Sequence, residues 1–265
     1  MDKFILGRYI PGQSLVHRLD PRSKLLAMFI YLLIIFWANN LLTNLILAGA
    51  TLLMILASGI KLSFFFNGLK PMFALILFTT VFQLFFTRGG TVFLDWGLIK
   101  ISDYSLAQAG LIFMRFILIT CVSTLLTLTT PPLSLADAVE SLLSPLKRFK
   151  VPVHEIGLIL SLSLRFVPTL MDDATRIMTA QKARGVDFGE GNLLQRIRST
   201  VPILIPLFAS SFKRADALAL AMEARGYQGG EGRSKYRVLK WQQADSSLIL
   251  GLLMLAVLLF LLKTN

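Results

Sequence analysis

From Leu25 to Ile60 the chain carries no charged residue, and this run decides the fold class. As one helix, at about 1.5 Å per residue, it would extend for about 54 Å, far beyond the roughly 30 Å hydrocarbon core of a bilayer. The run therefore has to turn back once, and Asn39-Asn40 offers the turn. We expect two membrane helices here, at about 25–38 and about 41–59.

Three later apolar stretches predict further spans, at about 71–87 with Pro71 at its start, about 105–129 and about 247–262. Hydrophobic residues make up 55% of the chain, charged residues only 16%, and the mean hydropathy is +0.68. These values are typical of a polytopic membrane protein rather than a soluble domain. Residues 88–103 are Gly-rich and contain Trp96, so we expect an external loop there with a small hairpin near the interface.

The net charge of +12 is explained by membrane topology. In a soluble protein it would suggest nucleic-acid binding, but Lys and Arg also accumulate in cytoplasmic loops of membrane proteins. A five-span topology with a cytoplasmic N-terminus places nearly all basic residues inside. Only Arg88, Lys100 and Lys263 then lie outside, and Arg115 lies within the bilayer. We therefore expect a multi-pass membrane protein with a cytoplasmic N-terminus, which contacts the lipid bilayer and no nucleic acid.

Residues 131–245 differ from the rest because charges return while apolar runs persist. Two long helical patterns, 153–184 and 192–224, each join an apolar half to a polar, amphipathic half. We expect a cytoplasmic helical coupling domain with two long crossing helices. The apolar halves could instead be short re-entrant or spanning pieces. The expected division is 1–130 with four spans, 131–245 as the coupling domain, and 246–265 as the last span.

The two long patterns end in the same way. Ala183-Arg184-Gly185 and Ala224-Arg225-Gly226 close a shared pattern, A-x5-A-x2-A-R-G, repeated 41 residues apart. Alanine is the best helix former, and glycine takes the left-handed conformation just past a helix end. Arg near a helix C-terminus also complements the helix dipole, so one copy alone could be a simple cap. Two copies on two rods predict two cationic tips that dock into two similar acidic grooves.

Catalytic signatures are absent from the sequence. It contains no G-x-x-x-x-G-K-[ST], no H-E-x-x-H and no G-x-S-x-G, and its only cysteine is Cys121. Asp172-Asp173 is a pair of carboxylates, but on a polar helix half we interpret it as a solvated face. We expect a non-enzymatic chain without its own cofactor or metal.

Two polar features have structural interpretations. Asp20-Pro21 can begin a helix, with Asp as N-cap and Pro at the first helical position. Arg115 lies about 15 Å into its span, where an arginine needs a partner such as Gln83 or backbone carbonyls. We favour a buried polar staple for Arg115 over a role in transport.

The sequence resembles the transmembrane T component of energy-coupling factor (ECF) transporters, relatives of the cobalt-transport Q component, over essentially its whole length. The resemblance rests on the two Ala-Arg-Gly signatures, on Leu164-Arg165-Phe166-Val167-Pro168, and on Pro11-Gly12-x-Ser14-x-x-His17-x-x-Asp20-Pro21-Arg22. It implies an all-α scaffold that joins two cytosolic ABC ATPases to a substrate-binding membrane protein, the S component. ATP and Mg would be bound by the ATPases, and a vitamin or metal ion would be carried by the S component.

Site residues follow from the resemblance by position. Those expected to contact the ATPases are Ala183, Arg184, Gly185, Ala224, Arg225 and Gly226. Those expected to face the S component, or to be structural, are Arg165, Phe166, Pro168, Pro202 and Pro206. Those expected to form a structural N-terminal motif are His17, Asp20, Pro21 and Arg22. The two ATPases are expected to be non-identical, and several S components to exchange on one apolar surface.

Two other functions remain as alternatives. A conventional ABC importer permease would form the substrate path itself, but such permeases couple through an E-A-A-x-x-x-G loop that Glu223-Ala224-Arg225-Gly226 does not match. A membrane-bound enzyme or lipid-binding protein could use the basic cluster 147–150, but no paired catalytic groups accompany it.

Overall fold

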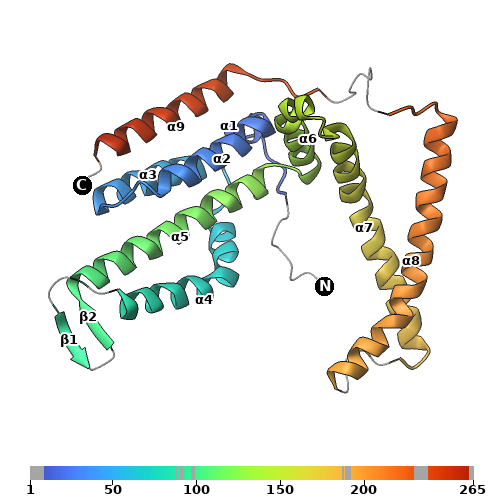
Figure 1. Cartoon of the computed structure of the whole chain (residues 1–265), viewed down its shortest axis with the longest axis horizontal. Helices are drawn as coiled ribbons and strands as arrows, with labels where there is room; N and C mark the ends of the chain where they lie inside the picture. Colours follow the sequence, from blue (N-terminus) through green and yellow to red (C-terminus); the bar gives the residue numbers. More distant parts are fainter. Residues whose placement is uncertain are drawn as a thin grey trace. The chain divides into compact units, whose positions relative to one another are not determined.

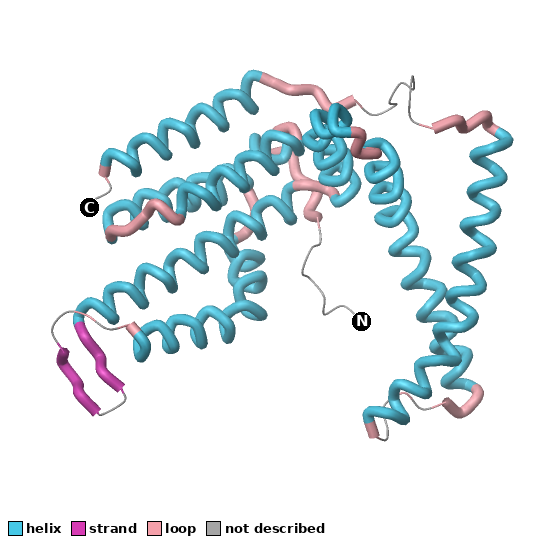
Figure 2. The backbone as a smooth tube through the Cα atoms, in the orientation of Figure 1, coloured by secondary structure: helices cyan, strands magenta, loops and turns pink. Residues whose placement is uncertain are grey.

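The computed structural model describes residues 9–87, 89, 92–96, 99–186, 188, 192–229 and 238–262. The described residues are mostly helical, with one small hairpin (Figure 2). The chain forms two compact units. The first unit comprises Met1–Ala138 and Leu239–Asn265, and the second unit comprises Val139–Val238. The all-α polytopic fold class is confirmed.

The elements follow the chain in the order labelled in Figure 1. They are α1 (Leu15–Arg18), α2 (Pro21–Ile35), α3 (Leu41–Ser58), α4 (Leu62–Phe86), β1 (Val92–Trp96), β2 (Ile99–Ser102), α5 (Asp103–Thr129), α6 (Pro132–Leu143), a 3-10 helix (Ser144–Phe149), α7 (Val153–Ala183), α8 (Leu193–Ala224) and α9 (Gln243–Leu261).

Local sequence signals set several of these boundaries. Asp20 caps α2 by accepting a hydrogen bond from the backbone N–H of Arg22, with Pro21 in the first turn, as predicted. Asn40 is the N-cap of α3, which confirms the turn between the first two helices. Strands β1 and β2 pair antiparallel, which confirms the expected hairpin. Pro145 falls in the 3-10 helix that directly follows α6.

Helix α4 differs from the prediction. It begins at Leu62 and contains Pro71, whereas we expected the helix to start at Pro71. Proline removes one backbone hydrogen bond and bends a helix without having to end it. Figure 1 shows a bend within α4. The segment between Lys61 and Lys70 is largely apolar, and it continues the helix toward the N-terminus.

The core of the first unit is formed by α2, α3, α5 and α9, which run side by side in Figure 1. Its buried residues are Ala27, Tyr31, Ile34, Ile35, Ala38, Leu47, Leu118, Val122, Leu252 and Leu259. The hydroxyl groups of Tyr31 and Thr51 lie 2.6 Å apart and form a buried hydrogen bond between α2 and α3. Most other large apolar side chains of α3, α4 and α9 are exposed, as expected for helices that contact lipid.

Five described helices are long and apolar enough to cross a membrane, by length and composition: α3, α4, α5, α7 and α9. The number agrees with the prediction, but the membership differs. Helix α2 has 15 residues, short of the roughly 20 that a span requires, although it packs in the same core. Helix α7 is among the five because its first half is apolar. This agrees with the alternative interpretation, in which residues 156–170 form a spanning piece.

The second unit is dominated by α7 and α8, which pack against each other and confirm two long helices. Pro168 lies inside α7, and Pro202 and Pro206 lie inside α8. Gln181 of α7 reaches Pro202 of α8, while Asp173 reaches Arg214. Residue numbers therefore fall along α8 as they rise along α7, so the two helices pack antiparallel.

Candidate functional site: two Ala-Arg-Gly helix ends

The two Ala-Arg-Gly sequences form the same helix cap. At the end of α7, Gly185 N–H donates to Lys182 O at 3.0 Å and Val186 N–H donates to Gln181 O at 3.1 Å. At the end of α8, Gly226 N–H donates to Glu223 O at 2.9 Å and Tyr227 N–H donates to Met222 O at 3.0 Å. This pair of bonds defines the Schellman motif. The sequence repeat is therefore also a repeat of backbone geometry.

The glycine of each motif is required by its backbone angle. Gly185 has φ of +88° and Gly226 has φ of +72°, which lie in the left-handed region that side chains disfavour. A Cβ added at either position would meet no atom within 4 Å. The glycines therefore allow the chain to turn sharply, and they leave the arginine just before the turn at the helix end.

Both arginines are exposed cap residues. Arg184 and Arg225 each directly follow the last helical residue and are exposed to solvent. Neither guanidinium makes a hydrogen bond or an ion pair with any residue that the structure describes. Each tip thus presents a planar fork of donors that suits a carboxylate-bearing partner.

The neighbours of the two arginines differ in charge. Lys182 precedes the first tip and Glu223 occupies the equivalent place before the second, and both are exposed. The first tip therefore presents two positive charges and the second presents one charge of each sign. Two tips of identical backbone but different charge are suited to two similar, non-identical grooves.

Exposed apolar side chains continue along α7 and α8. They are Ile159, Val167, Met171, Val201, Leu204, Ile205, Phe208, Phe212 and Leu220, each at least 42% exposed. Arg165, Pro168 and Pro206 are exposed, and Pro202 is partly buried. Phe166 is also partly buried, and its ring centre lies 5.9 Å from the guanidinium carbon of Arg214. An apolar surface of this extent is typical of a protein or membrane contact.

The N-terminal motif forms a compact polar arrangement in the first unit. His17 Nε2 lies 3.1 Å from Ile10 O, which can only accept, so Nε2 carries the proton. His17 Nδ1 then accepts from the Ser14 hydroxyl at 2.7 Å. A Cβ on Gly12 would lie 2.7 Å from the His17 ring, which explains the glycine in this motif.

Asp20 and Arg22 connect the start of α2 to the start of α9. Arg22 forms an ion pair with Asp20 at 3.0 Å and donates to Leu239 O at 3.0 Å. Asp245 is fully buried, and it accepts from the backbone N–H of Asp20 at 2.8 Å and of Gln242 at 2.7 Å. The motif is therefore structural in its contacts. Sequence reasoning missed Asp245, although an acidic residue beside a predicted span was a usable signal.

Lys24 extends this arrangement to the end of α5. Its ammonium donates to His17 O at 3.3 Å, Thr129 O at 3.1 Å and Thr130 Oγ1 at 3.4 Å. Lys24 precedes the span expected at 25–38, and burial lowers its pKa to about 8, although the charges of Asp245 and Asp20 oppose that shift. All three donors are occupied, so this lysine ties three chain segments together.

Arg115 is partly buried, and its contacts fit the interpretation of a polar staple. Its Nη2 donates to Ala38 O at 3.0 Å, and its guanidinium carbon lies 5.5 Å from the centre of the Phe36 ring. Gln83, the other candidate partner, instead donates to Thr87 of its own helix. Arg115 thus stabilises the turn between α2 and α3 from α5.

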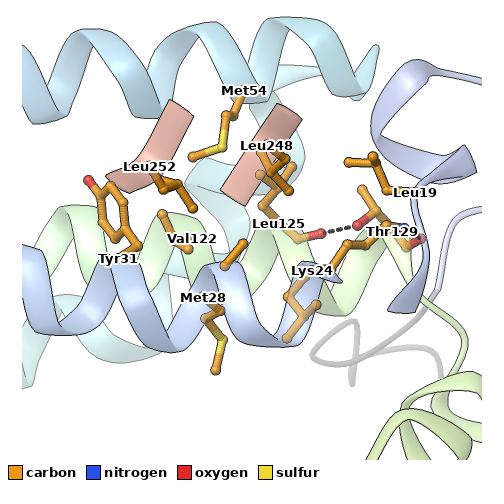
Figure 3. Close-up of a pocket in the computed structure, with 12 residues that line it drawn as sticks. Leu19, Lys24, Met28, Tyr31, Met54, Val122, Leu125, Thr129, Leu248 and Leu252 are labelled. Atoms are coloured by element: carbon orange, nitrogen blue, oxygen red, sulfur yellow. Dashed lines mark hydrogen bonds between the residues drawn. The ribbon is translucent and has the colours of Figure 1, made fainter. Parts of the chain in front are cut away.

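The cavity drawn in Figure 3 is small and apolar, and the first unit has two larger hollows, of about 200 Å³ between α3, α4 and α5 and of about 350 Å³ beside the N-terminal motif. The volume of the cavity in Figure 3 is about 50 Å³, and Lys24 and Thr129 lie at one end while Tyr31 lies at the other. Ligand pockets for small organic molecules typically have about 300–1,000 Å³. Among the described residues, no group of three or more His, Cys, Asp or Glu side chains could hold a metal ion.

These features define a class of protein: a polytopic helical membrane protein with an additional helical unit that ends in two exposed cationic tips. Comparison with known proteins identifies the family. Residues 12–236 match the family CbiQ, described as cobalt transport protein. The chain belongs to this family, and it is a transmembrane component of the energy-coupling factor transporter type, as its relatives indicate.

Those relatives cover essentially the whole chain. The energy-coupling factor transporter transmembrane protein EcfT of Streptococcus equi subsp. equi is 71% identical over 264 residues, covering 100% of this chain and 98% of that protein. The protein of the same name from Streptococcus thermophilus is 64% identical, with 100% of each chain covered. The one from Bacillus subtilis is 49% identical, with 99% of each covered. The recognition made from the sequence motifs is confirmed.

Proposed function

We propose that this chain is the scaffold subunit of an ECF importer, which transmits the ATP-driven motion of two cytosolic ATPases to a substrate-binding S component. The observation that carries the proposal is the pair of exposed arginines at Schellman ends of identical geometry. Each fork matches a carboxylate, and two tips on one chain fit two ATPase subunits. The ATPases would hold ATP and Mg, and this chain would hold no cofactor and catalyse no reaction.

The other partners follow from the remaining surface. The exposed apolar side chains of α7 and α8 would face the S component, because apolar contact without polar selection lets one scaffold accept several partners. The opposite charges of Lys182 and Glu223 favour two non-identical ATPases. We place the protein in the bacterial cytoplasmic membrane, with the N-terminus and both tips on the cytoplasmic side, because of the distribution of Lys and Arg. The cargo would be a vitamin or a metal ion.

A conventional permease is the second candidate, because α7 is apolar enough to span a membrane. A permease, however, needs a substrate path through its own helices. The two Ala-Arg-Gly ends, in place of the E-A-A-x-x-x-G loop through which such permeases couple, favour the scaffold.

Purification and uptake test the proposal. We expect the chain to co-purify with two ATPase subunits and a small hydrophobic protein, and a stable substrate-binding monomer would contradict this. In proteoliposomes, Arg184→Ala and Arg225→Ala are each expected to lower ATP-driven uptake, and the double variant nearly to abolish it. Arg176→Ala, at an exposed arginine in the middle of α7, about two helical turns before the first tip, serves as the control. Unchanged uptake in the double variant would show that the two arginines serve only as helix caps.

A further inference from the structure

The ion pair between α7 and α8 joins two equivalent positions of the internal repeat. Asp173 and Arg214 are 41 residues apart, the same separation as Arg184 and Arg225. Each therefore precedes its own tip by the same length of helix, about 16 Å at 1.5 Å per residue. Because the helices pack antiparallel, the two tips extend in opposite directions from this contact.

The contact is close and partly shielded from water. Arg214 Nη2 lies 2.6 Å from Asp173 Oδ2, and the two side chains are 29% and 22% exposed. The guanidinium also lies over Phe166 of α7. A charge-assisted bond of this length restricts both side chains to one geometry, unlike a solvated surface pair. Asp173 was interpreted from sequence as part of a solvated face, and the structure contradicts this interpretation.

The two copies of the repeat have different residues at this contact. An exact repeat would place the same residue at positions 173 and 214, and two like charges there would repel each other. The chain instead has Asp172-Asp173 on α7 and Lys213-Arg214 on α8. Opposite charges at equivalent positions allow the two copies to attract each other where they meet.

We propose that the Asp173–Arg214 ion pair is a positioning pair, which fixes the register of α7 and α8 and so sets the spacing of the two Ala-Arg-Gly tips. This proposal rests on the scaffold function. If the two helices move as one body, displacement of either tip is transmitted to the whole pair. If they slip, each ATPase moves its own helix, and ATP is hydrolysed without uptake.

A charge exchange tests the pair in the complete transporter, reconstituted in proteoliposomes. We expect Asp173→Ala and Arg214→Ala each to lower uptake per ATP hydrolysed by at least about fivefold, the lower end of typical couplings between sites. The double exchange Asp173→Arg with Arg214→Asp is expected to restore at least half of the loss. The matched control is Asp172→Ala with Lys213→Ala, because these neighbours are also equivalent in the repeat but are exposed. An exchange no better than the single variants, or a control with an equal loss, would overturn the proposal.

A distance measurement tests the geometry even where uptake fails for another reason. Spin labels would be placed at Lys182→Cys and Glu223→Cys, which flank the tips, with Cys121→Ser removing the native thiol. We expect a narrow distance distribution in the parent and in the charge exchange, and a broadened one with Asp173→Ala. An unchanged distribution with Asp173→Ala would refute the positioning role. If the proposed scaffold function itself were wrong, uptake would instead stay intact in the double variant Arg184→Ala with Arg225→Ala.

Discussion

Asp245 is the most buried acidic group at the junction of α2 and α9, and its removal gives a graded prediction of stability. Its Oδ1 accepts from the Asp20 N–H and from the Ser23 hydroxyl, and its Oδ2 accepts from the Gln242 N–H. Ser23 can turn its hydroxyl to Asp20 O, which lies 2.7 Å away, so it keeps a partner without Asp245. Asp245→Ala therefore leaves the buried N–H of Asp20 and the partly buried N–H of Gln242 without this partner.

The magnitudes follow from these contacts. A stranded buried donor costs about 1–3 kcal/mol and a partly buried one less, so Asp245→Ala is expected to lower the free energy of unfolding by about 2–4 kcal/mol. Asp245→Asn keeps Oδ1 but turns an amide toward Gln242 N–H, and it is expected to cost about 1–3 kcal/mol. The control Ser247→Ala removes an exposed bond within the same helix and is expected to cost less than about 0.5 kcal/mol.

Thermal unfolding of the transporter complex in detergent measures this order. With about 2–4 °C per kcal/mol for a chain of this size, Asp245→Ala is expected to lower the Tm on the order of 10 °C, and Asp245→Asn less. All variants are compared at one scan rate, because unfolding of membrane complexes is commonly irreversible. If both Asp245 variants had the same Tm as the Ser247→Ala control, the buried carboxylate would not anchor α9 to α2.

Two further predictions concern single positions. Gly226→Ala forces a side chain into the left-handed region and is expected to lower the free energy of unfolding of the complex in detergent by about 1–2 kcal/mol. The control Gly49→Ala lies in open space inside α3 and is expected not to lower this free energy. Equal effects of the two substitutions would contradict the assigned cap. Arg115→Met removes the bond to Ala38 O and is expected to lower the Tm by only about 2–4 °C, because Asn44 also donates to that carbonyl. Lost uptake despite this small change in Tm would instead assign Arg115 a role in transport.

Much of the fold could be predicted because its signals are local. The uncharged run 25–60 and Asn39-Asn40 predicted two helices and their turn, and Asp20-Pro21 predicted a helix start. Each depends on residues that are close in sequence and on the thickness of the bilayer. The start of α4 was missed because the helix continues through Pro71, and packing against α5 compensates for what the proline loses.

The polar contacts could not be predicted in the same way, because they join distant segments. Asp245 contacts Asp20 across 225 residues, and Lys24 contacts Thr129 across 105. A charge beside a span indicates that a partner is needed, but several candidates satisfy that need equally. The partner of Arg115 shows this, since Gln83 and a backbone carbonyl were both open and only packing decided between them.

The repeat carries information at two levels, and these have different physical consequences. Its identical part, Ala-Arg-Gly with the Schellman turn, gives two tips the same backbone and the same guanidinium. Its differing part changes charge at several places, and two of these are Asp173 against Arg214 and Lys182 against Glu223. The first difference is internal and binds one copy to the other. The second difference is exposed, so a partner can distinguish the two tips by their charge. The two copies of the helix can therefore form a pair that is both rigid and asymmetric.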